Sequence, residues 1–310
     1  MDCIGPIWIR PVAGPNMVGH YAPRIRAIPE DSHMKRNIAL IAVLAMLVAA
    51  CAAEEGGGGG DVSCEKEDLT LVQEGVLTIG TDEPSFPPWF DFEGGPETGT
   101  GFESAVAYAV AAELGFTEDE VTWVVVPFNN AFAPGEKDFD FDINQVSISE
   151  EREEAVDFSD GYYDVNQALL GFSDSEIASA TAIDDLKPYR LGAQVGTTSL
   201  DFITDVIQPD TEPLVYDTNA DAKAAFDAGQ LDGLVLDLPT AFFVSAVEIE
   251  GSTVIAQFPS AGESEQFGMV FEEGNPLCDC VNQALANVDL EAIQQEWLSD
   301  VVEAPIIETG

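Results

Sequence analysis

One arginine of this chain occupies a sequence context suited to binding an anion. Arg152 follows Ser147 by five residues and is one of only two arginines after Cys51. The chain has 57 acidic residues, and those that precede Cys51 are Asp2, Glu30 and Asp31. The remaining 54 carboxylates face six basic residues, a balance of −48. A guanidinium kept in so acidic a chain predicts recognition of a planar anion such as a carboxylate, because lysine cannot form the same two parallel hydrogen bonds.

Other residues able to contact a ligand stand at the expected ends of strands. In open α/β sheets, ligands bind beyond the carboxyl ends of the strands. The candidates at these ends, besides Arg152, are Asp82, Phe86, Trp89, Gln145, Ser147, Gln194, Thr197, Thr198 and Asp237. Together they offer a cation and hydroxyls for a carboxylate, an acid for an ammonium group, and aromatic rings for a side chain. This set complements a free α-amino acid.

Each candidate also has a purely structural interpretation. Arg152 could bridge surface acids, and Asp82 could cap a turn or a helix. Phe86 and Trp89 could both belong to the hydrophobic core. Asp237 is one carboxylate among many, so its position after an expected strand is what makes it a candidate.

The elements expected to position these residues alternate between short apolar strands and longer amphipathic helices. Strands are predicted at 76–79, 121–126, 139–143, 190–195, 214–216, 231–236, 254–258 and 267–271. Helices are predicted at 102–114, 220–228, 239–247, 281–288 and 290–301. The alternation predicts an α/β fold in which mostly parallel sheets are flanked by helices.

The pattern restarts near residue 184, which predicts two lobes, the second inserted into the first. The chain is expected to cross near residues 169–172 and to return near 255–258, so that two segments form a hinge. Residues 64–170 and 258–310 are then assigned to lobe 1, and residues 171–257 to lobe 2.

The first fifty residues are predicted to be a signal peptide with a mis-called upstream extension. Met34-Lys35-Arg36 begins a basic region, and the apolar run at 38–47 is too short to span a bilayer. The small residues before Cys51 match the cleavage pattern of a bacterial lipoprotein, which predicts lipidation of Cys51. The alternative is an ordinary secretory signal with an incidental cysteine. Residues 51–63 include Gly56 to Gly60 and are predicted to form a flexible tether.

Three cysteines remain after Cys51, namely Cys64, Cys278 and Cys280. A bridge between Cys278 and Cys280 would be strained, because one residue separates them. A bridge from Cys64 to one of the two would join the start of the fold to its end. The alternative is three buried free cysteines.

The acidity itself has two interpretations. The carboxylates are spread along the whole chain, which favours a solvated surface suited to a saline habitat over attraction of a cationic ligand. Nucleic acid is excluded as a natural partner, because the sequence has no basic patch. Both histidines, His20 and His33, precede Cys51, and the chain has no metal motif or phosphate loop. The sequence therefore predicts neither a metal site nor a cofactor.

Several motifs resemble those of the family 3 extracellular solute-binding proteins, the polar amino-acid receptors of ATP-driven importers. The resemblance extends from about residue 75 to 297. Its most specific part is Ser147-Ile148-Ser149-x-x-Arg152 with the downstream Val156-Asp157-Phe158-Ser159. Further matches are Gly80-Thr81-Asp82, Pro87-Pro88-Trp89, Gly101-Phe102-Glu103, Val195-Gly196-Thr197-Thr198-Ser199, and Asp232-x-x-x-x-Asp237-x-Pro239. Asn144-Gln145 departs from the small residues common before the Ser-x-Ser core.

The resemblance implies a two-lobe periplasmic-binding-protein fold of type II and a role for each matched residue. Arg152, Ser147 and the Thr197/Thr198 turn would bind the ligand carboxylate, and Asp237 would take its ammonium group. Phe86 would stack on the ligand, with Asp82 and Gln194 facing its side chain. The resemblance of the segment after Cys280 also implies that Cys64 pairs with Cys280 rather than with Cys278.

The expected function is that of a lipid-anchored amino-acid-binding protein on the outer side of the cytoplasmic membrane. It would act as a monomer that delivers its ligand to the permease of an ABC importer. The alternative is an enzyme on the same scaffold, such as a dehydratase acting on a small carboxylic acid, because a fold does not decide a function. A third possibility, the sensory half of a receptor, requires a downstream membrane span.

Overall fold

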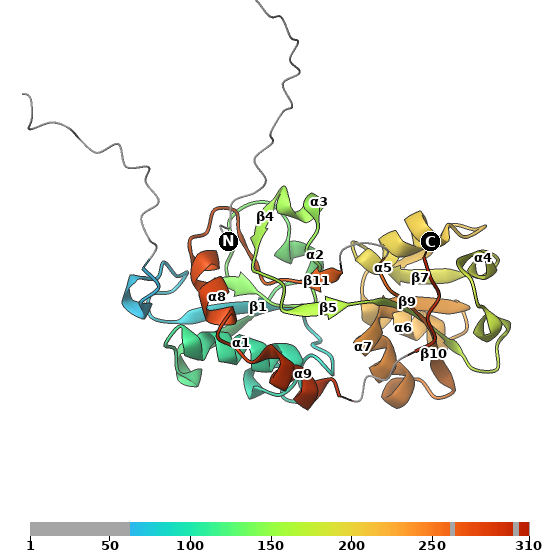
Figure 1. Ribbon diagram of the computed structural model, residues 1–310, viewed down its shortest axis with the longest axis horizontal. Helices are drawn as coiled ribbons and strands as arrows, with labels where there is room; N and C mark the ends of the chain where they lie inside the picture. The colour runs from blue at the N-terminus through green and yellow to red at the C-terminus, as the bar shows by residue number, and fades with distance from the viewer. Residues whose placement is uncertain (1–62, 261–263, 300–303, 310) are drawn as a thin grey trace, which may run out of the picture. The chain divides into compact units, whose positions relative to one another are not determined.

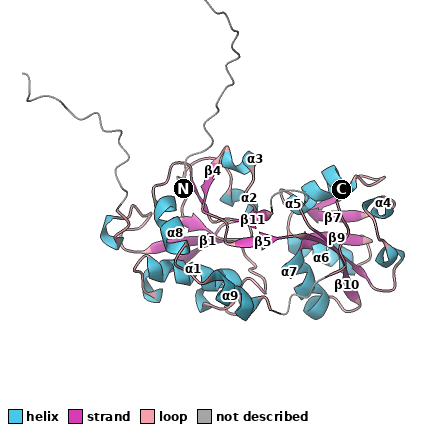
Figure 2. Cartoon of the chain, viewed as in Figure 1, coloured by secondary structure: helices cyan, strands magenta, loops and turns pink. Residues whose placement is uncertain are grey.

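The computed structural model describes residues 63–260, 264–299 and 304–309. Within these residues, two five-stranded sheets carry the helices (Figures 1 and 2). The predicted signal peptide, the predicted lipidation of Cys51 and the predicted glycine tether all fall outside the described residues. No described helix has the length and apolar composition needed to cross a bilayer.

The first lobe is built on the sheet with strand order β2-β1-β3-β12-β4. Its strands are β1 (Leu77–Thr81), β2 (Val121–Val125), β3 (Phe141–Asp142), β4 (Val156–Phe158) and β12 (Val270–Glu272). Its helices are α1 (Phe102–Glu113), α2 (Phe128–Ala131), α3 (Glu150–Glu153), α8 (Leu277–Leu285) and α9 (Leu290–Trp297). Strands β2 and β3 run parallel to β1, whereas β12 is antiparallel to both β3 and β4.

The second lobe is built on the sheet with strand order β10-β6-β9-β7-β8. Its strands are β6 (Gln167–Phe172), β7 (Leu191–Gln194), β8 (Leu214–Tyr216), β9 (Gly233–Asp237) and β10 (Ser252–Phe258). Its helices are α4 (Ile183–Leu186), α5 (Thr198–Asp201), α6 (Asn219–Asp227) and α7 (Leu238–Phe243), with π-helical turns that continue α5 and α7. Strands β8 and β9 run parallel to β7, and β6 is antiparallel to β9 and β10.

Each sheet therefore mixes parallel and antiparallel pairs, and the parallel pairs lie where helices make the crossovers. Short 3₁₀ turns at Lys66–Asp68, Pro96–Thr98, Glu118–Glu120 and Glu176–Ser179 complete the connections.

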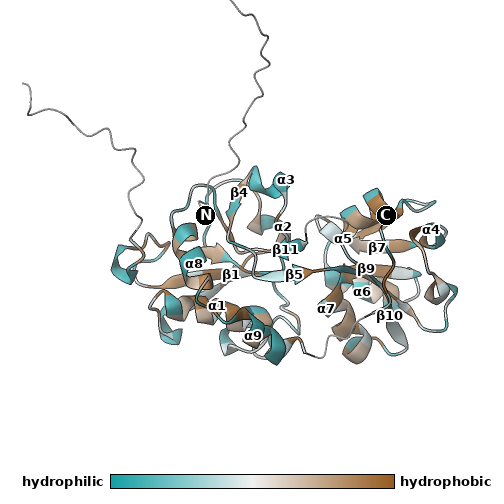
Figure 3. Cartoon of the chain, in the orientation of Figure 1, coloured by the Kyte–Doolittle hydropathy of each residue, from teal (hydrophilic) through white to brown (hydrophobic). Residues whose placement is uncertain are grey.

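The core of the first lobe explains the position of α1. Phe102, Val106 and Val110 fall on one face of this helix, and all three are fully buried. That face joins the hydrophobic cluster that includes β1, α8 and α9. Gly115, with φ at +86°, follows the end of the helix, in a conformation that favours glycine. Figure 3 shows α3, by contrast, as hydrophilic, because it carries charged residues at each of its four positions.

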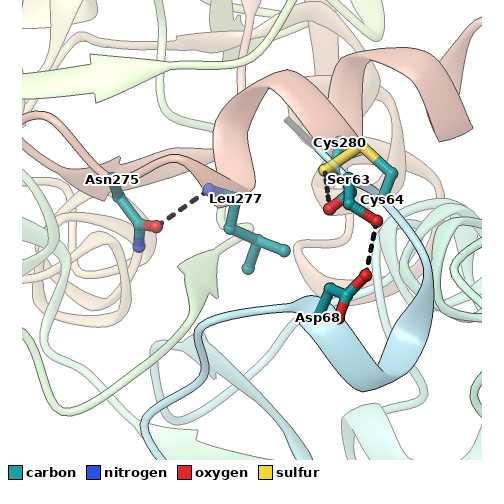
Figure 4. Close-up of a disulfide and its surroundings, with 6 residues drawn as sticks. All are labelled: Ser63, Cys64, Asp68, Asn275, Leu277 and Cys280. Atoms are coloured by element: carbon teal, nitrogen blue, oxygen red, sulfur yellow. Dashed lines mark hydrogen bonds between the residues drawn. A yellow bond between two sulfur atoms is a disulfide. The ribbon is translucent and has the colours of Figure 1, made fainter. Parts of the chain in front are cut away.

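A disulfide joins the beginning of the described chain to α8 (Figure 4). Cys64 is bonded to Cys280, with 5.3 Å between their Cα atoms and a sequence separation of 216. Next to the bridge, Ser63 Oγ donates a hydrogen bond of 2.6 Å to Asp68. The pairing implied by the family resemblance is therefore present in the structure.

Two short strands form the crossing between the lobes. β5 (Tyr163–Val165) and β11 (Glu265–Phe267) pair antiparallel; β5 is followed after one residue by β6, and β11 comes after β10 in the chain. Asn166 follows β5, and its Nδ2 donates to Oε1 of Gln257, near the end of β10. The two-lobe α/β fold with a two-segment hinge is thus confirmed.

The structure shifts the boundaries that the sequence suggested. The expected crossing at residues 169–172 falls inside β6, which pairs along its length within the second sheet. The first crossing therefore precedes Gln167. The apolar run of β6 gave no sign of the change of lobe, because it is buried on both faces.

The C-terminal segment was assigned to lobe 1, but its described end packs on the second lobe. Gln257 donates from its backbone N to Pro305 O and accepts from Ile307 N, at 2.8 and 3.1 Å. Ala304 and Ile307 join the two hydrophobic clusters of that lobe. This short segment has neither helical nor strand periodicity, so the sequence pattern could not place it.

Candidate functional site

A cleft receives side chains from both lobes at the carboxyl ends of their parallel strands. Nine of the ten predicted ligand-binding residues line it, namely Asp82, Phe86, Gln145, Ser147, Arg152, Gln194, Thr197, Thr198 and Asp237. The lining residues that the sequence analysis missed are Glu83, Pro84, Phe128, Asn144, Ser199, Thr218, Asn219 and Ala220. Glu83, Pro84, Asn144 and Ser199 stand next to predicted residues or within two positions of them, which could have identified them. Phe128 and residues 218–220 lie at the starts of α2 and α6, after the expected strands at 121–126 and 214–216.

Arg152 is a buried cation, 9% exposed, rather than a surface bridge. Its backbone N donates to the Oγ of Ser149, which begins α3. The guanidinium donates to the carbonyl of Ser147 at 2.5 Å and, from the other lobe, to the carbonyl of Gly196 at 2.9 Å. Within the described part of the chain, no carboxylate lies within 4 Å of it. Burial lowers the pKa of Arg152, which indicates an under-compensated cation suited to an anionic ligand.

Two phenylalanines fix the plane of this guanidinium. Its carbon lies 4.4 Å from the ring centroid of Phe132 and 5.8 Å from that of Phe128. Such stacking suits arginine because its guanidinium is planar and weakly hydrated. The hydrogen bonds to two carbonyl oxygens and the two rings together hold Arg152 in one orientation at the cleft.

The opposing turn of the second lobe has the expected helix start. Thr197 begins α5, and its Oγ1 accepts from Leu200 N at 3.2 Å. Gly196 has φ at +75°, and a Cβ there would lie 2.2 Å from Oδ1 of Asn129. The positive φ favours glycine at this close approach of the two lobes, and a side chain there would also displace the amide of Asn129. Thr198, next in sequence, lies 3.4 Å from Ser147 between their hydroxyl oxygens.

Asp237 ends β9 and forms the acidic side of the cleft. Its Oδ1 accepts a hydrogen bond of 3.0 Å from Nε2 of Gln167. Burial, followed by the negative charge of Glu265, raises the pKa of Asp237 to about 8. Neither Gln167 nor Glu265 was a candidate from the sequence, since neither belongs to a motif.

Asp82 and Gln194 lie in the cleft but are also used by the protein itself. Asp82 accepts from the backbone N of Glu83 and from that of Phe128, at 2.7 and 3.2 Å, so it caps the start of α2 as well. Burial raises the pKa of Asp82 despite these bonds. Gln194 uses its Oε1 to accept from the backbone N of Asn219 at 2.7 Å, which positions the start of α6.

Gln145 is held in an unusual backbone conformation by a buried acid. Its φ is +50°, in the left-handed region that costs a non-glycine residue free energy. Glu103 of α1 accepts from the backbone N of Gln145 at 2.6 Å, from its side-chain amide and from the Tyr162 hydroxyl. Burial raises the pKa of Glu103 to about 7. Glu103 thus positions Gln145 without itself lining the cleft.

Phe86 presents one face to a cation of the second lobe. Lys223 Nζ lies 3.8 Å from the ring centroid and pairs with Glu248 at 2.7 Å. The ring lines the cleft, and its stacking on the ligand stays a prediction of the resemblance.

Trp89 differs from the expectation, because the structure places it in the core and not at the cleft. It is fully buried and makes edge contacts with the rings of Phe102 and Phe267. Its Nε1 donates to Oγ1 of Thr240 in the other lobe at 2.9 Å. The Pro87-Pro88-Trp89 motif therefore serves packing and contact between the lobes.

A second buried acid lies on the strand that leads to the cleft. Asp142 is fully buried, and neither of its carboxylate oxygens has a hydrogen-bond partner. Burial, then the charges of Glu103 and Asp82, raise its pKa well above the usual value. Nδ2 of Asn144, two residues further along, is also without a partner.

Comparison with known proteins supports the resemblance to the solute-binding proteins. The model of the bacterial extracellular solute-binding proteins, family 3, matches residues 77–300. The L-cystine-binding protein TcyJ of Escherichia coli K12 is 28% identical over 233 residues, which cover 73% of this chain and 83% of that protein. An ancestral arginine-binding protein solved with glutamine bound is 26% identical, with a TM-score of 0.61, over 74% of this chain and 100% of its own.

A third relative bears on the enzyme alternative. It is the ancestral amino acid-binding protein AncCDT-1, described as a precursor of cyclohexadienyl dehydratase. It is 25% identical, with a TM-score of 0.59, over 72% of this chain and 95% of its own. The family model covers most of the described residues, and the two-lobe fold agrees with the solved relatives. This chain therefore belongs to the bacterial extracellular solute-binding proteins, family 3.

Proposed function

We propose that this protein binds a free polar amino acid and delivers it to the permease of an ABC importer. The observation that carries the proposal is Arg152, a buried guanidinium at the cleft with no described carboxylate within 4 Å. A ligand carboxylate would supply the missing charge, next to the Ser147 hydroxyl and the start of α5. Asp237, on the same cleft, would receive the ammonium group.

The finer parts of the assignment rest on the sequence. We propose that Cys51 is lipidated, that the protein is anchored outside the cytoplasmic membrane, and that it works as a monomer. The lobes would close on the ligand by bending at the paired strands β5 and β11.

We further propose that the protein is a binder and not an enzyme. One relative is a precursor of a dehydratase, so the scaffold alone does not separate the two. The support comes from TcyJ and the ancestral arginine-binding protein, whose names describe binding.

A thermal-shift screen of the twenty amino acids and L-cystine tests the proposal. A compound that binds the folded protein raises its melting temperature by mass action. We expect at least one amino acid to do so, and its des-amino analogue to do so far less. Mass spectrometry of the incubated compounds would show no product, whereas turnover would favour the enzyme alternative. If no compound raises the melting temperature, the proposed function is wrong.

A further inference from the structure

Glu265 lies at the hinge, in contact with residues of both halves of the cleft. It belongs to β11 and is paired with Val165 of β5. Its Oε1 accepts a hydrogen bond of 2.6 Å from Ser147 Oγ of the first lobe. Gln167, the first residue of β6, donates to its two carboxylate oxygens at 3.3 and 3.2 Å.

The amide of Gln167 connects Glu265 to Asp237. Its Nε2 lies 3.0 Å from Oδ1 of Asp237 and 3.3 Å from Oγ1 of Thr198. Its Oε1 accepts from Ser199 Oγ at 2.6 Å, which fixes the NH₂ group toward the two carboxylates. Gln167 is only 3% exposed, so water reaches this group poorly.

In this arrangement the carboxylates of Asp237 and Glu265 have few hydrogen-bond donors. The NH₂ group of Gln167 has two hydrogens, but four oxygens lie within 3.3 Å of its nitrogen. Three of them belong to the two carboxylates. Among the described residues, the donors to these two carboxylates, Gln167 and Ser147, are both neutral, and only Gln167 donates to Asp237, so the pair favours a further cation or a proton.

We propose that Glu265 is the second acid of the ammonium site. It acts on Asp237 through Gln167, so that Asp237 carries a proton before the ligand arrives and releases it when the ligand's ammonium group binds. The inference rests on the proposed function. In the balanced step, the protonated carboxyl of Asp237 meets the ligand R–NH₃⁺. The carboxylate pairs with the ammonium, and the released proton goes to the solvent. Glu265 is a positioning residue, and Asp237 touches the ligand.

The charged and titratable groups facing Asp237 support this exchange. Glu265 of β11 and Glu103 of α1 raise its pKa, and Arg152 of α3 lowers it, with burial as the largest cause and a resulting value of about 8. Tyr163 of β5 also faces it, and its own pKa is raised by burial and by the charge of Asp237. Removal of the charge of Glu265 would therefore lower the pKa of Asp237, although burial would still raise it, so that a larger fraction of Asp237 would be ionised before the ligand arrives.

Proton release during binding is the decisive measurement. The probe is the amino acid that gives the largest shift in the thermal screen, titrated calorimetrically in two buffers of different ionisation enthalpy. At pH 7 the wild type is expected to release close to one proton per ligand. Its affinity is expected to rise about tenfold from pH 6 to pH 7, because the ionised form of Asp237 binds the ammonium.

Three variants separate the roles. Glu265→Gln is expected to release less than half as much proton at pH 7 and to show a flatter affinity profile. Glu265→Asp keeps the charge and is expected to retain most of the release. Glu273→Gln removes the same charge from an exposed position and is expected to behave as wild type.

The possible results distinguish failure of this inference from failure of the proposed function. If the wild type binds the probe without releasing a proton, or if Glu265→Gln releases as much as wild type, this inference is wrong and the proposed function stands. Loss of release in both Glu265→Gln and Glu265→Asp would indicate a structural role and also overturns it. If Glu265→Gln does not fold, the wild-type count together with Glu265→Asp decides. If no amino acid binds, the proposed function fails and this inference with it.

Discussion

At the scale of single residues, Arg152 shows how a side chain becomes specific through the groups that surround it. Two carbonyl oxygens and two aromatic rings fix its orientation, and no described acid neutralises it. The neighbouring acids Asp201, Glu265 and Asp237 favour its charged form only at longer range. The residue is thus ready for an anion before one arrives.

Replacement of Arg152 should weaken ligand binding more than it weakens the fold. Arg152→Ala removes the cation, and loss of one partner of a buried charged pair costs about 2–5 kcal/mol, or tens to thousands of fold in affinity. Arg152→Lys keeps the charge but loses the paired hydrogen bonds, so a smaller loss is expected. Calorimetry with the amino acid found in the screen measures both. Near-normal affinity in Arg152→Ala would exclude the carboxylate role.

Asp142 is expected to make stability fall as pH rises. Its folded pKa is raised, so between the unfolded and folded pKa values the folded state holds more protons than the unfolded state. The free energy of unfolding should therefore decrease with increasing pH across that window, by at most about 1.4 kcal/mol per pH unit for one group. Asp142→Asn removes this contribution, and its advantage over wild type should grow with pH.

Urea denaturation at pH 5, 6, 7 and 8 tests this effect. Glu103 and Asp237 also have raised pKa values and act in the same direction, so the comparison is the difference between variant and wild type at each pH. Parallel stability curves for the two proteins would contradict this prediction, because they would show that the folded pKa of Asp142 is not raised into or above this range.

At the scale of elements, the connection between the lobes involves more than the two hinge strands. The C-terminal segment returns to the second lobe, where Gln257 bonds to Ala304, Pro305 and Ile307 through its side-chain amide and backbone. The same side chain accepts from Asn166 at the first crossing. The described C-terminal segment is therefore attached to the second lobe, beside the hinge.

Two adjacent isoleucines of this segment make a matched test. Ile307 is 3% exposed and packs in the core of the second lobe, whereas Ile306 is 56% exposed. Ile307→Ala should lower the free energy of unfolding by about 2–4 kcal/mol, because it leaves a cavity. Ile306→Ala should change it by no more than about 0.5 kcal/mol. Chemical denaturation of both variants checks this, and equal effects would mean that the segment is not docked in solution.

At the scale of the whole molecule, acidity is the dominant property. The described residues contain four ion pairs, made by Lys66, Lys187, Arg190 and Lys223. From Cys51 onward, 54 carboxylates face six basic residues, so most acids have no cationic partner. Self-repulsion of this kind opposes the compact state.

We expect the protein to be more stable in molar salt than in dilute buffer. At about 0.1 M ionic strength the Debye length is about 10 Å, so neighbouring carboxylates still repel, whereas at about 1 M it is about 3 Å. The melting temperature should therefore rise with sodium chloride. Ligand affinity should change less, because the buried charges of the cleft are poorly screened. A flat or falling melting temperature would mean that the surface acids are already neutralised locally.

The sequence by itself determined the features that depend on local pattern. The helical stripe of α1, the β-branched strand β2 and the turn before α5 were each predicted within a few residues of their observed bounds. The family motif placed Arg152, Ser147 and Asp237, because each belongs to a short segment with a characteristic order of residues. These positions follow from periods of two and 3.6 residues and from turn chemistry, which act over a few neighbours.

Only the tertiary structure decided which distant residues meet. Glu265 lies 118 residues from Ser147 in sequence, and Gln167 lies 70 residues from Asp237, so no local pattern could join them. Trp89 was predicted at the cleft but lies in the core, where it makes aromatic contacts with α1 and β11 and a hydrogen bond to Thr240 in the other lobe. Burial likewise set the pKa values of Glu103 and Asp237, because desolvation depends on the packed neighbours and not on the residue type. The sequence therefore determined the elements and the ligand class, while packing determined the raised pKa values of the buried acids, the hinge and the attachment of the C-terminal segment.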